Sequence, residues 1–153
     1  MVSFIEINEI NYRAVCGLKV SKEQESFVAP PISILARAYA KRKANAKALA
    51  IGNGDKIIGV VLFLEMTEEP ACYTIEQFLI DEKYQNQGFG KKALKLVMEL
   101  LEKERKYEVV EICVKKTATQ ALKVYQDFGF SDTGYTDPNE PDSFILGYRF
   151  SSS

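Results

Sequence analysis

A stretch with two glycines is the part of this sequence best suited to bind an anion. Residues 84–92 read YQNQGFGKK and lie between a predicted strand that ends near Ile80 and a predicted helix that begins near Gly90. The first N–H groups of a helix have no helical partner and carry partial positive charge. Gly88 and Gly90 would let an anion approach them, and the two lysines that follow add charge. The stretch therefore predicts a phosphate site, with an ordinary strand-to-helix turn as the alternative.

Two widespread phosphate-binding motifs fit this stretch poorly. A P-loop needs a glycine where Gln85 stands, and Ser or Thr where Lys92 stands. The dinucleotide fingerprint G-x-G-x-x-A is satisfied by Gly88, Gly90 and Ala93. That fingerprint normally follows the first strand of an alternating βαβ series, whereas this stretch follows antiparallel strands past mid-chain. The strand after it also ends in two lysines and offers no acid for a ribose, so a dinucleotide is disfavoured.

The composition limits the chemistry further. The chain has 153 residues and no histidine, which excludes Ser-His-Asp and Cys-His nucleophile systems and histidine-ligated zinc. A general base must then be a carboxylate, lysine, tyrosine, thiolate or water relay. Cys16, Cys72 and Cys113 are far apart, which favours reduced thiols in a cytoplasmic protein over a disulfide or metal site. A net charge of -1 gives no support for nucleic-acid binding, and no apolar run is long enough for a membrane span.

Hydrophobic periodicity predicts the elements that position these groups. Strands are expected at 3–7, 46–51, 56–66, 72–80, 108–114, 130–136 and 143–150, and helices at 8–17, 33–45 with Ser33 as cap, 90–106 and 118–128. The turn between the second and third strands is GNGD, and Gly129 follows the last helix. One strand–helix–strand crossover lies among antiparallel strands, which predicts a mixed α/β sheet with helices on both faces.

The spacing Gln85-x-x-Gly88-x-Gly90 resembles the Q/R-x-x-G-x-G/A motif of the GNAT superfamily of N-acetyltransferases, and the predicted element order is similar to that fold over nearly the whole chain. The resemblance implies a single GNAT domain over residues 1–153, with a mostly antiparallel sheet of about seven strands flanked by about four helices. It also implies acetyl-CoA (coenzyme A) as cofactor. The implied cofactor-binding residues are Phe78, Leu79, Ile80, Gln85, Asn86, Gln87, Gly88, Phe89, Gly90, Lys91 and Lys92.

Glu76 is the candidate general base. Period-two alternation predicts that it shares a face of its strand with Phe78 and Ile80, where apolar neighbours would suit a base, although a solvated strand carboxylate is the simpler interpretation. The strand resembles that of spermidine/spermine acetyltransferases, which carries a glutamate nine residues before the motif's Q/R. Glu76 and Gln85 have that spacing, which implies a catalytic base that acts through water.

Tyr125 is the candidate general acid. It lies on an apolar helical stripe, so periodicity alone favours a core aromatic. The pattern A-x-x-x-Y-x-x-x-G-F, from Ala121 to Phe130, resembles the family's pattern and implies a tyrosine that protonates the departing thiolate of coenzyme A. Many family members carry asparagine where Ala118 stands. One cofactor contact is therefore missing or is made by Thr117 or Thr119.

The acceptor amine is the least constrained part of the prediction. Residues 18–28, LKVSKEQESFV, resemble the first-helix loop of bacterial diamine and polyamine acetyltransferases, which implies a polyamine such as spermidine or spermine. Alternatives are another amine (an amino acid, an antibiotic or a protein N-terminus) or a non-catalytic coenzyme A sensor, and a homodimer is implied by family only. Candidate substrate residues are Glu23, Glu25, Tyr39 and Glu76, with Glu65, Glu68, Glu69 and Tyr12 as further groove-lining groups; solvated surface is an equal interpretation of the acids.

Overall fold

The computed structural model describes residues 1–152, and the predicted order of helices and strands is confirmed there. The strands are β1 (Val2–Ile5), β2 (Lys47–Asn53), β3 (Lys56–Met66), β4 (Cys72–Ile80), β5 (Val109–Lys115), β6 (Ser131–Asp132) and β7 (Ser143–Arg149). The α-helices are α1 (Tyr12–Cys16), α2 (Pro31–Ala40), α3 (Phe89–Glu104) and α4 (Thr119–Phe128). Short 3-10 turns cover Lys22–Gln24 (η1), Arg42–Ala44 (η2) and Glu82–Tyr84 (η3).

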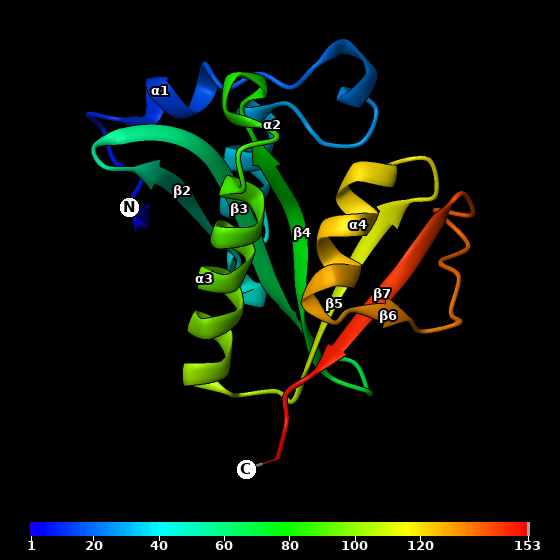
Figure 1. Cartoon of the computed structure of the whole chain (residues 1–153). Helices are drawn as coiled ribbons and strands as arrows, with labels where there is room; N and C mark the ends of the chain where they lie inside the picture. The colour runs from blue at the N-terminus through cyan, green and yellow to red at the C-terminus, as the bar shows by residue number, and fades with distance from the viewer. Residues whose placement is uncertain (153) are drawn as a thin grey trace.

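The strands form one mixed sheet in the order β1-β2-β3-β4-β5-β7-β6. β4 and β5 are parallel, with α3 as their crossover, and the other neighbouring pairs are antiparallel. Helices α3 and α4 cover one face, while α1 and α2 cover the other (Figure 1). This arrangement confirms the predicted fold class.

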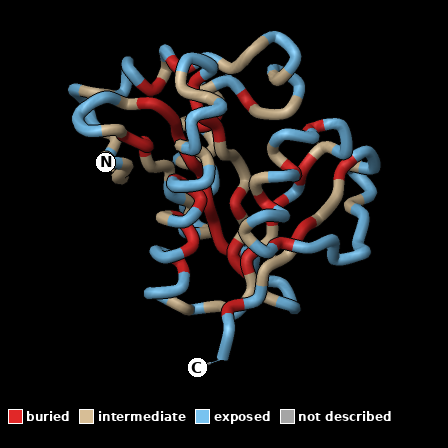
Figure 2. The backbone as a smooth tube through the Cα atoms, in the orientation of Figure 1, coloured by how far each residue is buried: buried red, intermediate tan, exposed pale blue. Residues whose placement is uncertain are grey.

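Each face of the sheet has its own apolar core. The stripe of α3 that includes Leu94, Val97 and Leu101 is buried against the first face, as its periodicity predicts. Val15 of α1 and Ile34 of α2 are fully buried against the second face. Buried residues therefore run along the central strands on both sides (Figure 2).

Strands β4 and β5 pair over a short distance and then diverge. Their register covers only Tyr73–Ile75 of β4, opposite Val110–Ile112 of β5, and Figure 1 shows the strands separating beyond that point, with α4 beside the gap. The second half of β4 therefore has a free edge toward β5. Backbone N–H and C=O groups along such an edge are available to a ligand.

A β-bulge interrupts β4 at Glu76. Gln77 is opposite Leu62 and Ile75 is opposite Phe63, so Glu76 is an extra residue without a partner on β3. A bulge re-aims the side chains that follow it. The direction of the Glu76 side chain therefore cannot be obtained from simple alternation along the strand.

Two local predictions are wrong. Helix α2 begins at Pro31, not after a Ser33 cap, because proline is favoured in the first helical turn. It ends at Ala40, and the chain then makes the η2 turn and a left-handed residue at Asn45 before β2. β6 covers two residues, whereas the sequence predicts a strand over 130–136. Beyond Asp132 the regular ladder ends, although Thr133 still donates both its N–H and its hydroxyl to the Ile145 carbonyl.

Candidate active site

A cavity of about 680 Å³ opens where β4 and β5 diverge. Its walls come from the loop between α1 and α2, the second half of β4, the start of α3 and the first half of α4. Ten of the predicted site residues line it: Glu23, Phe78, Leu79, Ile80, Gln85, Asn86, Gly88, Gly90, Lys91 and Tyr125. Six predicted residues lie outside the lining: Glu25, Tyr39, Glu76, Gln87, Phe89 and Lys92.

The N-terminus of α3 opens onto this cavity without a capping side chain. The first helical hydrogen bond is donated by the Lys92 N–H to the Gly88 carbonyl, at 3.2 Å. Within residues 1–152, the N–H groups of Phe89, Gly90 and Lys91 have no hydrogen-bond acceptor. Free N–H groups at the positive end of a 16-residue helix form an anion site.

The two glycines of the motif have different roles. Gly88 is the N-cap of α3 and has φ 83°, a left-handed conformation that glycine adopts without strain. Gly90 has ordinary helical geometry, and a Cβ built there would meet nothing within 4 Å. Because Gly90 lines the cavity, its missing side chain leaves open space for a ligand to approach the backbone.

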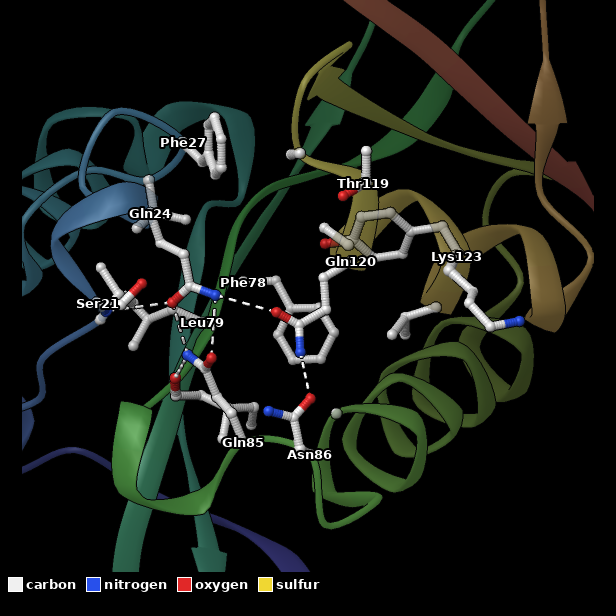
Figure 3. Close-up of a pocket in the computed structure, with 18 of the residues that line it drawn as sticks. Ser21, Gln24, Phe27, Phe78, Leu79, Gln85, Asn86, Thr119, Gln120 and Lys123 are labelled. Carbon is white, nitrogen blue, oxygen red and sulfur yellow. Dashed lines mark hydrogen bonds between the residues drawn. The ribbon is translucent and has the colours of Figure 1, made fainter.

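Four side-chain amides form a hydrogen-bonded network across the cavity (Figure 3). Gln85 donates to the Ile80 carbonyl at 2.8 Å, which ties the motif to the end of β4. Gln85 and Gln24 exchange two hydrogen bonds of 2.9 and 3.0 Å. Gln24 also donates to Gln120 at 3.2 Å, and Gln120 donates to Asn86 at 2.6 Å.

Tyr125 closes the inner end of the α4 wall. Its residue is only 6% exposed, and its ring lies 6.3 Å from that of Phe78 and 6.0 Å from that of Phe130. Within residues 1–152 its hydroxyl has no hydrogen-bond partner, although the residue lines the cavity. Burial raises the pKa of Tyr125 above its usual value, so the hydroxyl keeps its proton at neutral pH.

Glu76 lies on the opposite face of β4 from the one predicted. Its carboxylate accepts hydrogen bonds from Lys41 at 2.8 Å and Arg37 at 3.4 Å, both on the α2 side of the sheet. Phe78 and Ile80, by contrast, pack in the core under α3 and α4. The prediction of a shared face is wrong because the bulge at Glu76 breaks the alternation of the strand.

Glu65 does not line this cavity but a second one, together with Tyr73 and Lys106. Its side chain is buried at the end of β3, where it accepts hydrogen bonds from Asn45, Lys106 and Tyr107. Burial raises the pKa of Glu65, but these three hydrogen bonds outweigh burial and lower the pKa overall. Glu65 therefore holds η2 and the segment that follows α3 to the sheet, at the end of β3 that pairs with the start of β4.

The remaining acceptor-side predictions have mixed positions. Glu23 and Phe27 line the cavity, whereas Glu25 is exposed outside the lining. Tyr39 is 70% exposed and packs against the guanidinium of Arg42 at 4.2 Å. Thr117 and Thr119, the two candidates for the contact missing at Ala118, both line the cavity. Further lining residues on α4 are Gln120, Ala121, Lys123 and Val124.

A comparison with protein-family models matches residues 12–130 to the acetyltransferase (GNAT) family. The chain belongs to the GNAT family. A curated GNAT relative, the spermine/spermidine N(1)-acetyltransferase of Bacillus subtilis (strain 168), is 28% identical over 138 residues, which cover 87% of this chain and 90% of the relative.

Solved structures show the same GNAT fold. The ribosomal-protein-S18-alanine N-acetyltransferase from Escherichia coli matches with a TM-score of 0.72 and 16% identity, over 100% of this chain and 96% of that one. A GNAT family acetyltransferase from Elizabethkingia anophelis, crystallised with acetyl-CoA bound, matches with a TM-score of 0.67 and 19% identity, over 98% and 97% of the two chains. At these identities the likeness establishes the fold.

Sequence reasoning missed several residues that the GNAT fold brings to this site. Gln24 and Gln120 are 96 positions apart, yet their amides meet in the cavity. Lys123 also lines the cavity, and it shares the carboxylate of Asp127 with the predicted residue Lys91, at 3.2 and 3.6 Å. The one sequence signal for Gln120 and Lys123 is their position in the first turns of a helix that follows a strand.

Within residues 1–152, no helix has the length and apolar character needed to cross a membrane.

Proposed function

We propose that residues 1–153 form one catalytic unit, an N-acetyltransferase that uses acetyl-CoA to acetylate a primary amine, with a polyamine such as spermidine or spermine as the acceptor. The observation that carries the proposal is the cavity itself. It joins an uncapped helix N-terminus, the free edge of β4 and a buried tyrosine without a hydrogen-bond partner. An anion site, a strand edge and a proton donor are the groups that a thioester of coenzyme A requires.

The residues present fit the cofactor. The N–H groups at the start of α3 would hold the pyrophosphate, with Lys91 and Lys123 as nearby cations. Gly90 leaves the room that a bound phosphate needs, since a Cβ there would face open space. The free edge of Phe78–Ile80 would hydrogen-bond an amide-containing arm in the manner of an added strand. When bound, acetyl-CoA supplies an activated acetyl group.

Two side chains carry the proposed proton transfers. Tyr125 would donate a hydrogen bond to the leaving sulfur, because its hydroxyl is protonated at neutral pH and has no competing partner. Glu76 would accept a proton from the amine, directly or through a water molecule. The Lys41 ammonium now occupies one oxygen of Glu76, so a cationic amine must compete with it.

The choice of a polyamine is supported by the Bacillus subtilis relative and by acidic side chains on the acceptor side. Glu23 lines the cavity, and Glu76 binds a lysine whose aminobutyl ammonium resembles one end of a polyamine. A carboxylate on the acceptor side attracts a multiply charged cation. We also infer that the protein is cytoplasmic and forms a homodimer. Light scattering of the purified protein would test the homodimer.

A second acceptor class is favoured by one observation. Arg37 and Lys41 place two cations beside Glu76, and a carboxylate on the acceptor would pair with them. An amino acid has such a group next to its amine, and a short peptide has one at its C-terminus, whereas a polyamine has none. These acceptors therefore belong in the same experiment.

A panel of amines distinguishes these functions. Free thiol released from acetyl-CoA would be followed with spermidine, spermine, amino acids, an aminoglycoside and a short peptide. We expect turnover with spermidine or spermine, and its loss in Glu76→Gln. Turnover confined to amino acids or peptides would refute the polyamine and support the second class. Binding of coenzyme A without thiol release for any amine would instead indicate a sensor.

A further inference from the structure

We propose that Gln24 is a positioning residue that couples cofactor binding to the arrangement of the acceptor loop, defined here as residues 18–28. The proposal rests on the proposed function, because it takes coenzyme A as the occupant of the cavity. Gln24 lines the cavity, but within residues 1–152 its side chain makes no hydrogen bond with α3. Its side chain instead links three segments that are far apart in the chain (Figure 3).

The acceptor loop is fixed near its two ends. The Lys19 N–H donates to the Asp81 carboxylate at 3.0 Å, and the Lys19 carbonyl accepts from the Glu82 N–H at 2.7 Å. Just beyond the other end, the Ala29 N–H donates to the side chain of Gln77 at 2.8 Å. Between these points, Gln24 makes the side-chain hydrogen bonds that reach out of the loop to other elements. Its position therefore sets where the middle of the loop lies.

The Gln24 side chain pairs with Gln85 of the cofactor motif. Gln24 and Gln85 exchange hydrogen bonds in both directions, a pairing that fixes both amide planes. Gln85 is also bound to the Ile80 carbonyl, and the Ser21 N–H donates to the Gln24 oxygen at 3.2 Å. Any shift of the motif at Gln85 is thus passed to the backbone of the acceptor loop at Ser21.

The Gln24 side chain also forms a hydrogen bond across the cavity. Gln24 donates to Gln120 on α4, and Gln120 donates to Asn86 beside the motif. Gln120 and Asn86 are exposed, whereas Gln24 and Gln85 are half-buried. A ligand that fills the cavity between α3 and α4 would displace the hydrogen bonds of Gln120 first, because Gln120 is exposed and each of its neutral hydrogen bonds contributes only about 1 kcal/mol.

Displacement of Gln120 would leave the two hydrogen bonds with Gln85, in the motif that the bound cofactor would order, as the links from Gln24 to other elements. The acceptor loop would then be positioned by the motif that holds the cofactor, and no longer by α4. Glu23 precedes Gln24 and Phe27 follows it by three residues, and both side chains line the cavity. Coenzyme A would in this way arrange the acceptor-side wall before an amine binds, which is a coupling between two sites.

The test is hydrogen–deuterium exchange of the wild-type protein and Gln24→Met, each with and without coenzyme A alone. Methionine has nearly the same length but makes no amide pair. We expect coenzyme A to slow exchange in residues 18–28 of the wild type by about threefold, which corresponds to about 0.7 kcal/mol of coupling. Gln24→Met should lose this protection while its affinity for coenzyme A stays within about threefold, a change of under about 0.7 kcal/mol.

Gln126→Met is the matched control, because Gln126 is exposed on α4, outside the cavity lining, and its side chain makes no hydrogen bond within residues 1–152. It should behave as the wild type. Equal protection of the loop in wild type and Gln24→Met would overturn the proposal, as would a wild-type loop that coenzyme A leaves unprotected. A loss of coenzyme A affinity of tenfold or more in Gln24→Met, about 1.4 kcal/mol, would make Gln24 a direct cofactor contact and also overturn it. Absence of coenzyme A binding in the wild type would refute the proposed function itself.

Discussion

Replacing Tyr125 by phenylalanine removes a single oxygen from the cavity. The ring contacts with Phe78 and Phe130 stay, because their centroid distances of 6.3 and 6.0 Å do not depend on the hydroxyl. Within residues 1–152 the hydroxyl has no hydrogen-bond partner, so the substitution breaks no hydrogen bond. We therefore expect the free energy of unfolding to change by less than about 0.5 kcal/mol.

The catalytic effect should be much larger. A general acid contributes roughly 10²–10⁴-fold, which is about 2.7–5.4 kcal/mol at the transition state. We expect kcat of Tyr125→Phe to fall by at least about a hundredfold with acetyl-CoA and spermidine both saturating, because the departing thiolate loses its proton donor. The affinity for coenzyme A should change little. Thiol release gives kcat, and urea unfolding gives the stability of the same preparation.

Tyr148→Phe is the matched control. Tyr148 belongs to the neighbouring aromatic cluster, with its ring 5.3 Å from Phe128 and 5.5 Å from Phe130, but it does not line the cavity. The same loss of one oxygen there should leave kcat within about twofold, since the group is remote from the reacting atoms. If Tyr125→Phe retains more than about a third of wild-type kcat, less than about 0.7 kcal/mol is lost, and Tyr125 is not the acid.

The pH profile tests the same assignment. Burial raises the pKa of Tyr125, so the protonated form is retained past the ordinary tyrosine value of about 10. Activity should therefore show no alkaline limb from Tyr125 below about pH 10. An alkaline limb with a midpoint near pH 8 or 9 that disappears in Tyr125→Phe would contradict the burial argument.

Three further predictions concern other parts of the site and the fold. Gly90→Ala should keep or raise the melting temperature, since alanine favours a helix by about 1 kcal/mol, while the added methyl weakens coenzyme A binding in calorimetry. Lys41→Ala should lower KM for spermidine, because it frees one oxygen of Glu76; an unchanged or higher KM would exclude competition. Hydrogen bonds lower the pKa of Glu65 overall, so its stabilisation is complete above the unfolded value of about 4.3 and is lost as pH falls through the lower folded value. Glu65→Gln should therefore reduce the unfolding free energy by about 1–3 kcal/mol at pH 7 and by less near pH 3, measured by urea titration.

The sequence predicts the elements of this fold well where periodicity is strong. The bounds of β4 agree with the prediction, because the segment is rich in β-branched and aromatic residues. Helix α3 differs by one residue at its start and two at its end, because its apolar pattern is long and regular. The motif around Gly88 is predicted for a similar reason, since spacing within one loop is a local property. Prediction fails at α2, where both proline and a following 3-10 turn set the bounds.

The direction of Glu76 could not be predicted from spacing. Alternation assumes a regular strand, and the segment around Glu76 contains no glycine or proline that would indicate a bulge. Its partners are Arg37 in α2 and Lys41 directly after α2, which are 39 and 35 positions away in sequence. Gln24 and Gln120 meet only because the sheet order brings η1 and α4 to the same cavity. Such contacts depend on topology, which local patterns do not encode.

The bulge and the divergence of β5 together explain how one strand can serve both substrates. Glu76 lies on the face of the sheet covered by α2, whereas Phe78 and Tyr125 lie on the face covered by α3 and α4. A closed sheet would keep an amine beside Glu76 apart from a thioester beside Tyr125. Because β5 leaves β4 after Ile112, the free edge of β4 is a place where the two faces communicate. If Glu76 is the base, the amine must reach the thioester around this edge, so the gap between β4 and β5 is as necessary to the reaction as the two side chains.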